Sequence, residues 1–298
     1  MSLTESIRTR VALIALSGGA VAIGFAPIFV RLSQIGPSAT AFWRLTLALP
    51  ALWLWMLLEA QGQGTPRRLF SRADYGRLML AGLFFAGDLA VWHWSIRFTS
   101  VANATLLANF APVFVALGSW LVFGQGVSLT FLLGMGAALA GTTLMVGTSF
   151  QVSVQHLWGD ALGFITAMFY AGYLLAVKRL RGDFSAATVM AWSGTVTSAA
   201  LFPIARLSGE HLFPLSAHGW GPLIGLALIS QVGGQSLIAY ALAHLPAAFS
   251  SVALLLEPVM ATVFAWVILD EAIGPWQALG GVLVLAGIFG ARRESQAA

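Results

Sequence analysis

Hydrophobic positions in this chain gather into long continuous runs that are separated by short polar connections. Ten runs can be drawn, at residues 11–30, 38–58, 77–96, 101–123, 128–147, 158–177, 186–206, 219–241, 246–268 and 275–290. A helix needs about 20 apolar residues to cross a hydrocarbon core about 30 Å thick. The runs are apolar throughout and do not alternate, which is typical of membrane helices rather than barrel strands. The pattern predicts an all-α polytopic membrane protein with ten transmembrane helices.

Composition agrees with this class and removes several others. Hydrophobic residues make up 58% of the 298 positions and charged residues only 9%, against about 25% charged in a soluble domain. The net charge is +4, but the basic residues punctuate apolar runs instead of forming one polar face, so no nucleic-acid partner is expected. There is no cysteine and the five histidines are scattered, so we expect no cofactor and no metal site. The expected partners are membrane lipid and a small-molecule substrate, with a monomer favoured.

The basic residues of the connections are distributed unevenly between the two sides of the membrane. Three lie on one side: Arg31, Arg97 and Arg206. Eleven lie on the other: Arg8, Arg10, Arg67, Arg68, Arg72, Arg77, Lys178, Arg179, Arg181, Arg292 and Arg293. Cytoplasmic loops carry the excess of Lys and Arg. The sequence therefore predicts cytoplasmic N- and C-termini.

The chain also repeats itself. With a shift of 146 positions, the third to fifth runs align with the eighth to tenth, matching Pro112 with Pro258, Trp120 with Trp266, Gly134 with Gly280 and Gly141 with Gly287. We expect two five-helix units, residues 1–149 and 150–298, in one integral membrane unit. Because five is odd, the second unit must be inverted relative to the first. Inverted repeats are typical of alternating-access carriers, although a duplication can also simply build a stable bundle.

Three stretches carry a resemblance to a known family: "FWRLTLALP" (42–50), "LLLEPVMATVFAWVILDE" (254–271) and "GGVLVLAGIFG" (280–290). With the five-plus-five duplication, the chain resembles the EamA family of the drug/metabolite transporter superfamily, and within it the YddG-type amino-acid exporters. The resemblance implies export of small metabolites by alternating access without ATP hydrolysis. It also implies a cavity lined by spans one, three, four, six, eight and nine, with spans five and ten outside. Gln125 stands where the second copy has Glu271, so the first copy departs from the family motif.

The most unusual position is Glu257, which lies near the middle of the ninth run and is followed by Pro258. A carboxylate at this depth costs about 2.5–3.5 kcal/mol on insertion scales, so it should face the bundle interior or water. It could contact a substrate amine or carry a proton; alternatively it is a protonated structural acid. Pro112 and Pro258 predict a paired kink, and the ring of Pro258 should free the carbonyl of Leu254.

The third run supplies a second acid, Asp88, with Trp92 one helical turn later on the same face. A carboxylate beside an indole suits recognition of a cation and of an apolar side chain. The alternative is that Asp88 pairs with a basic residue and Trp92 packs. We expect the nearby His93 to have a structural role.

Uncharged polar and aromatic side chains complete the candidate substrate site. Gln231 and Gln235 share a face of the eighth run, and their amides could hold a zwitterion. Tyr170 and Tyr173 of the sixth run could stack on a substrate, and Asn109 adds a polar position to the fourth. For each of them, hydrogen bonding or packing between helices is an equally good explanation.

Arg44, in the second run, could hold a substrate carboxylate or an outer gate, but arginines at such depths more often make structural contacts. Together these features favour a secondary transporter that exports small organic metabolites, amino acids of aromatic or neutral type in particular. An intramembrane enzyme would need a catalytic pair such as Asp88 and His93, which lie on different faces of their helix. A membrane scaffold would tolerate apolar replacements of the interior polar residues.

Overall fold

The computed structural model describes residues 3–62, 71–99, 101–146 and 156–295, which are helical with short connections and contain no strand. The elements are α1 (Leu3–Gly24), α2 (Ala26–Leu32), α3 (Pro37–Gly62), α4 (Arg72–Phe98), α5 (Val101–Ala108), α6 (Ala111–Phe123), α7 (Leu129–Val146), α8 (Leu157–Leu180), α9 (Ala186–Leu207), the 3₁₀-turn η3 (Ala217–Gly219), α10 (Trp220–Gly225), the π-helix η4 (Leu226–Gln235), α11 (Ser236–His244), α12 (Ala247–Ala253), α13 (Leu256–Leu269) and α14 (Pro275–Ser295). Thus Arg67, Arg68 and the 149/150 boundary lie outside the described residues.

In the described part of the chain, nine helical stretches are long and apolar enough to cross a membrane. They correspond to the first nine predicted runs, and four of them join several helices: α1 with α2, α5 with α6, η3 to α11, and α12 with α13. The tenth run, the shortest in apolar length, forms the 21-residue helix α14. The prediction of an all-α polytopic membrane protein is confirmed.

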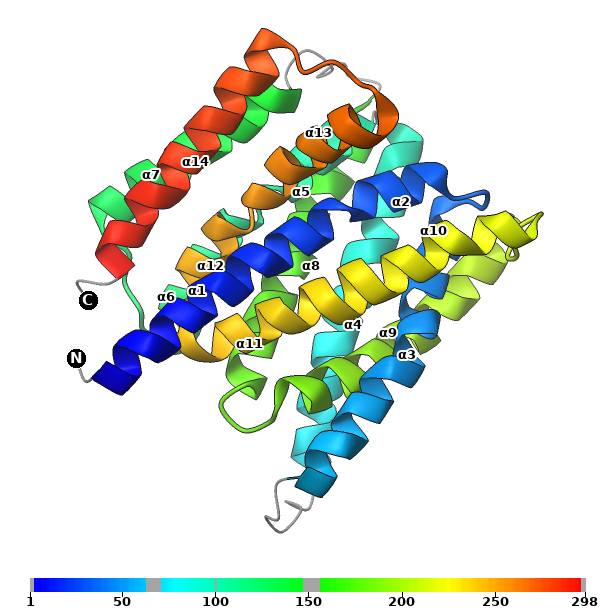
Figure 1. Ribbon diagram of the computed structural model, residues 1–298, viewed down its shortest axis with the longest axis horizontal. Coiled ribbons are helices and arrows are strands. Elements are labelled where there is room, and N and C mark those ends of the chain that lie inside the picture. Colours follow the sequence, from blue (N-terminus) through cyan, green and yellow to red (C-terminus); the bar gives the residue numbers. More distant parts are fainter. Residues whose placement is uncertain (1–2, 63–70, 100, 147–155, 296–298) are drawn as a thin grey trace.

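The connections of the bundle gather at its two ends. Helix α1 begins and α14 ends at the same end (Figure 1), which we call the termini end. At this end Arg77 of α4 pairs with Asp74 and, at 2.7 Å, with Asp183 in the connection between α8 and α9. At the opposite or far end, Arg31 of α2 pairs with Glu271 after α13. Each ion pair between distant residues thus joins two parts of the chain that the order of the runs places on the same side of the membrane.

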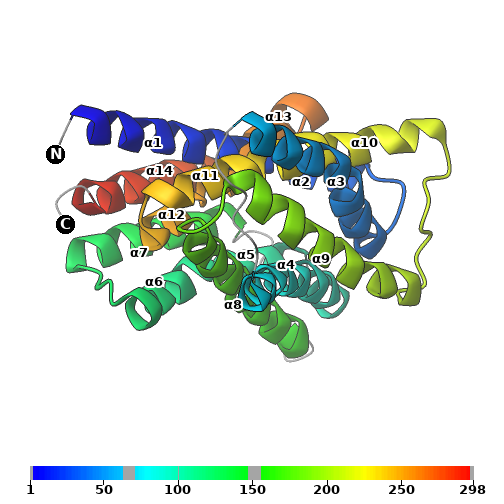
Figure 2. The same ribbon diagram turned by 90° about the horizontal axis from the view of Figure 1, so that it is seen from below.

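Helices α7 and α14 lie side by side along one edge of the bundle in both views (Figures 1 and 2). Glycines let their backbones meet: a Cβ on Gly141 would lie 2.5 Å from the carbonyl oxygen of Gly280, and one on Gly287 would lie 2.5 Å from that of Gly134. Under the 146-residue shift Gly134 corresponds to Gly280 and Gly141 to Gly287, so the contact is reciprocal. Reciprocal contacts are what a two-fold relation between two copies produces, as inverted repeats require.

The fourth and ninth spans are broken at matching points. Helix α5 gives way to α6 just before Pro112, and α12 gives way to α13 just before Pro258. Prolines fit the first turn of a helix, where an N–H has no intrahelical partner. The C-terminal ends of α6 and α13 also correspond, because Gly124 and Asp270 close them with left-handed backbones at φ 65° and φ 55°. The predicted paired kink is therefore a paired break.

The third and eighth spans differ, although they occupy matching places in the repeat. Helix α4 continues without a break from Arg72 to Phe98, whereas the eighth span contains the ten-residue π-helix η4 between two α-helical parts. A π-helix is rare and is frequently found at functional sites. The amides Gln231 and Gln235 both belong to η4.

Candidate functional site

The two broken spans approach each other in the interior of the bundle. Between them lies a small space of about 20 Å³, lined by Ala108, Asn109, Ala111 and Pro112 of the fourth span, by Tyr170 of α8, and by Ser251, Leu254, Leu255 and Glu257 of the ninth. A cavity of this size holds about one water molecule. The break thus brings Glu257, Asn109, Pro112 and Tyr170 together, as a site between the two copies requires.

The backbone at the second break is better satisfied than the sequence suggested. Pro258 removes the regular helical bond to Leu254, but the carbonyl of Leu254 is not free, because the N–H of Glu257 donates to it at 2.9 Å. At the first break a bond of the same i→i+3 type, though not at the corresponding position, joins the N–H of Val113 to the carbonyl of Phe110 at 3.0 Å. Tightened i→i+3 bonds of this kind commonly satisfy helix ends. The expectation of a freed carbonyl at Leu254 was wrong.

Arg44 lies inside the bundle, two turns into α3, with only 9% of its surface exposed. Its Nε donates a hydrogen bond to Oε1 of Gln231 on the π-helix at 2.9 Å. The guanidinium carbon lies 5.8 Å from the centre of the Phe85 ring, within cation–π range. Arg44 therefore does not extend its head group to the membrane surface; it links α3, α4 and η4 at the centre.

Two carboxylates, Asp88 of α4 and Glu257 of α13, accompany this arginine. Arg44 interacts electrostatically with both acids, and the two acids interact with each other. Among the described residues neither carboxylate has a hydrogen bond or an ion pair within 4.0 Å. The alternative in which Asp88 forms a direct pair with a basic residue is thus not observed. The three ionisable groups therefore lie near one another without a direct contact.

Aromatic rings form one wall of this centre. Phe85 stacks on Tyr173 with 4.5 Å between ring centroids, and Tyr173 stacks on Tyr170 at 6.2 Å. Tyr173 is 1% exposed and its hydroxyl lies 3.8 Å from the sulfur of Met190, so it supports the wall from behind. Tyr170 is half-buried and lines the small cavity. Of the two tyrosines, Tyr170 is thus the one placed to contact a solute.

The remaining predicted residues are less closely connected. Gln235 is 3% exposed and its Oε1 has no hydrogen-bond donor among the described residues. Within the described residues no hydrogen bond joins Gln235 to the charged side chains, although Gln231, one turn earlier in η4, accepts a hydrogen bond from Arg44. Trp92 is half-buried one turn after Asp88. The side chain of His93 lies outside the described residues.

Sequence reasoning did not identify Phe85 or Ser251 as members of the site. Phe85 lies one turn before Asp88 and two turns before Trp92 on α4, and helical spacing alone could have placed it on their face. Ser251 lies in the ninth span, one and a half turns before Glu257, without a recognisable motif around it. Within the described residues no three His, Asp or Glu side chains gather as metal ligands.

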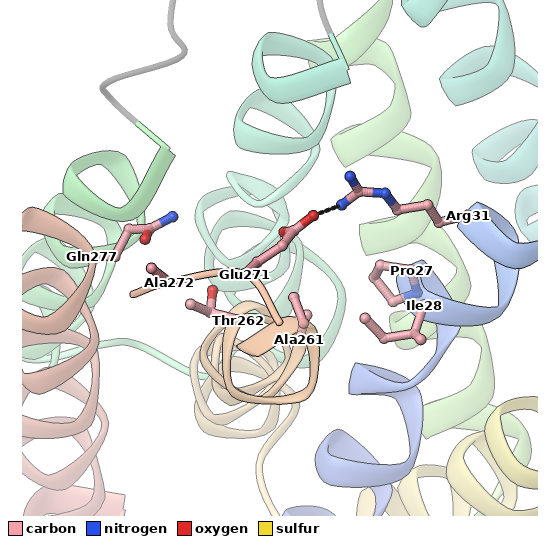
Figure 3. A pocket seen from close by; sticks show the side chains of 9 residues that line it. Pro27, Ile28, Arg31, Ala261, Thr262, Glu271, Ala272 and Gln277 are labelled. Carbon is pink, nitrogen blue, oxygen red and sulfur yellow. Dashed lines mark ion pairs between the residues drawn. The ribbon is translucent and has the colours of Figure 1, made fainter. Parts of the chain in front are cut away.

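A larger pocket opens at the far end of the bundle (Figure 3). It measures about 230 Å³ and is lined by Pro27, Ile28, Arg31, Ala261, Thr262, Ala265, Glu271, Ala272 and Gln277. The ion pair between Arg31 and Glu271 crosses it (Figure 3). Glu257, Ala261 and Ala265 are spaced by four along α13 and share one helix face. The face that lines the pocket therefore leads down to the central acid.

The two ends of the bundle are packed unequally. Toward the termini end, α6 packs on α12, and α8 packs on both α11 and α12. The corresponding pairs toward the far end are α5 with α13, and α1 or α2 with α4 and α5. None of these makes a comparable contact within the described residues. The interior is thus closed toward the termini end and more loosely packed toward the far end.

Comparison with known proteins agrees with this architecture. A solved crystal structure superposes with a TM-score of 0.78 over 100% of this chain and 99% of its own, at 17% identity, which shows a shared fold. A pseudopaline exporter of Pseudomonas aeruginosa is 22% identical and covers 84% of both chains. A probable terminal-alkyne amino-acid exporter of Streptantibioticus cattleyicolor is 29% identical and covers 92% of both.

The EamA-like transporter family matches twice, at residues 10–147 and at residues 157–293. The two matches cover the two copies that the 146-residue repeat and the reciprocal glycine contact define. A chain with this duplicated fold, built from membrane-spanning helices, belongs to the EamA-like transporter family.

Proposed function

We propose that this protein exports small organic metabolites, in particular amino acids of aromatic or neutral type, across a bacterial inner membrane. Transport proceeds by alternating access and needs neither ATP hydrolysis nor an enzymatic step. The two copies, residues 1–149 and 150–298, enclose the solute between them near the membrane midplane. A single chain suffices for this arrangement.

The observation that carries the proposal is the charged centre formed by Arg44, Asp88 and Glu257. Arg44 and Asp88 come from the first copy and Glu257 from the second, so the centre lies where the copies meet. Charged groups inside a membrane are costly and mark solute or ion pathways. Carriers with inverted repeats place the substrate at this interface, beside discontinuous helices. The two spans broken before Pro112 and Pro258 both border the cavity at Glu257.

The names of two relatives agree with an organic, amino-acid-like cargo. One is described as a pseudopaline exporter and the other as a probable terminal-alkyne amino-acid exporter. In this chain a mixed site suits such a solute. Asp88, Glu257, Gln231 and Gln235 supply polar groups, while Trp92, Tyr170 and Asn109 line the remainder and Tyr173 supports Tyr170 from behind. Arg44 and Glu257 are also the candidates for coupling or gating.

The excess of basic residues at the termini end supports an orientation with both chain ends in the cytoplasm. The tightly packed end then faces the cytoplasm, and the pocket between α2 and α13 faces outward. The Arg31–Glu271 pair lies at the outer mouth. The arrangement corresponds to the outward-facing state, in which an exporter releases its cargo.

Counterflow in liposomes tests the proposal directly. Purified protein is reconstituted with an unlabelled amino acid inside, and uptake of the same labelled amino acid is followed for a panel that includes phenylalanine, tryptophan, leucine and threonine. We expect saturable uptake of one or more of them, absent from protein-free liposomes. If no amino acid, nucleoside, sugar or amine moves, the transport proposal is refuted.

A further inference from the structure

Three ionisable side chains lie near one another at the centre without a direct contact. Arg44 interacts electrostatically with Asp88 and Glu257, but no ion pair within 4.0 Å joins them in the described part of the chain. A low-dielectric interior strengthens the attraction between separated charges and makes unpaired ones costly. A solute that carries charges of both signs would bridge this gap and satisfy both sides.

The guanidinium of Arg44 has capacity to spare. It has five N–H donors, and the hydrogen bond to Gln231 uses the donor at Nε. The two terminal nitrogens have no hydrogen-bond partner among the described residues. They are not fully buried and keep some accessible surface. The residue is nevertheless 91% buried and rests against Phe85. An arginine held in this way presents a planar fork that matches a carboxylate.

We propose that Arg44 is the carboxylate receptor of the central site and that Asp88 and Glu257 take the ammonium group of the same solute. The inference rests on the proposed function and sharpens it, because the recognised feature is the α-amino-acid head group rather than the side chain. Gln231 acts as a positioning residue that fixes the guanidinium through Nε. The amino-acid side chain then lies toward Tyr170.

The division of labour can be tested with phenylalanine and two truncated analogues. The analogue 3-phenylpropionate lacks the ammonium group, and 2-phenylethylamine lacks the carboxylate. Inhibition of labelled-phenylalanine counterflow and the thermal shift of the purified protein report binding independently. For the unmodified protein we expect phenylalanine to bind about 10- to 100-fold more tightly than either analogue, the range for hydrogen bonds to charged groups.

Variants then assign each end of the solute. Arg44→Gln is expected to weaken phenylalanine about 10- to 100-fold and to leave 2-phenylethylamine unchanged, whereas Asp88→Asn should weaken 2-phenylethylamine and leave 3-phenylpropionate unchanged. Arg206→Gln, at an exposed arginine of α9, serves as the control and should change neither. Gln231→Glu covers the case in which Arg44→Gln does not fold: the new carboxylate keeps the bond to Arg44 and competes with the solute carboxylate.

Two results would overturn the inference. One is equal binding of phenylalanine and 2-phenylethylamine to the unmodified protein. The other is a folded Arg44→Gln or Gln231→Glu variant that weakens both ligands by the same factor, which would make Arg44 structural. Thermal shifts that follow this pattern without any counterflow would instead keep the site and refute the transport function, so the two failures remain distinguishable.

Discussion

The two copies of this chain agree in backbone and disagree in chemistry. Their fourth spans break before Pro112 and Pro258, and their fifth spans meet through reciprocal glycines. The charged residues do not follow the symmetry: Glu257 corresponds to Ala111, and Asp88 corresponds to Gly234. Symmetry therefore supplies the broken helices and the glycine contact between α7 and α14, which we call the seam. Each copy contributes one acid from a different span. The geometry of a carrier can be duplicated even though the chemistry of its site is built only once.

The seam between α7 and α14 gives the largest expected effect. A side chain at Gly141 would meet the backbone of α14 at 2.5 Å, so Gly141→Leu must push the helices apart. Overpacking of this kind costs about 3 kcal/mol or more. Gly287→Leu, its counterpart, should cost a similar amount if the two-fold relation holds, as measured by thermal unfolding in detergent.

Gly136→Ala is the matched control in the same helix, because nothing lies within 4 Å of a Cβ at Gly136. It should leave the unfolding midpoint nearly unchanged. Markedly different losses for Gly141→Leu and Gly287→Leu would break the symmetry of the seam.

The second-largest effect is expected from a substitution of Glu257, the acid within the ninth span. Glu257→Gln removes a charge that Ala111 cannot replace in the first copy. We expect the initial rate of phenylalanine counterflow to fall about 10- to 100-fold, because a neutral amide binds an ammonium group more weakly than a carboxylate does. A folded variant with an unchanged rate at every pH would exclude Glu257 from both binding and proton transfer.

Substitutions at the C-terminal caps of α6 and α13 test the symmetry at one pair of corresponding residues. Gly124 and Asp270 share a left-handed backbone, which a side chain adopts at a cost. Asp270→Gly should stabilise the protein by about 0.5–1 kcal/mol and Gly124→Asp should destabilise it by a similar amount. The apparent unfolding midpoints in detergent should move in opposite directions, and a shift of both in the same direction would contradict the shared geometry.

The smallest effect is expected at the outer mouth. Glu271→Gln gives the second copy the residue that the first has at Gln125 and removes the ion pair with Arg31. Both partners are well exposed, with 63% and 43% of their side chains accessible, and exposed pairs contribute about 0–1 kcal/mol. Transport at moderate salt should change less than twofold, and any difference should shrink at high salt. A loss as large as that of Glu257→Gln would make this pair a true gate.

Much of the fold was predictable because each span must satisfy a membrane on its own. The apolar runs gave the spans, and the positions of Pro112 and Pro258 gave the breaks, since each proline lacks the N–H for an intrahelical bond. The site was predicted less completely. Periodicity placed Asp88, Gln231 and Glu257 toward the interior, but it could not show that Gln231 bonds Arg44, because that contact joins residues 187 positions apart.

The amino-acid sequence by itself determined the class of protein, the duplication and the depth of the interior acids, because hydropathy, spacing and helix breakers act locally along the chain. Only the tertiary structure decided that Arg44 lies inside the site, that the eighth span contains a π-helix, and that one end of the bundle is closed. These features depend on which helix faces which, and that choice is made by packing between segments far apart in the sequence.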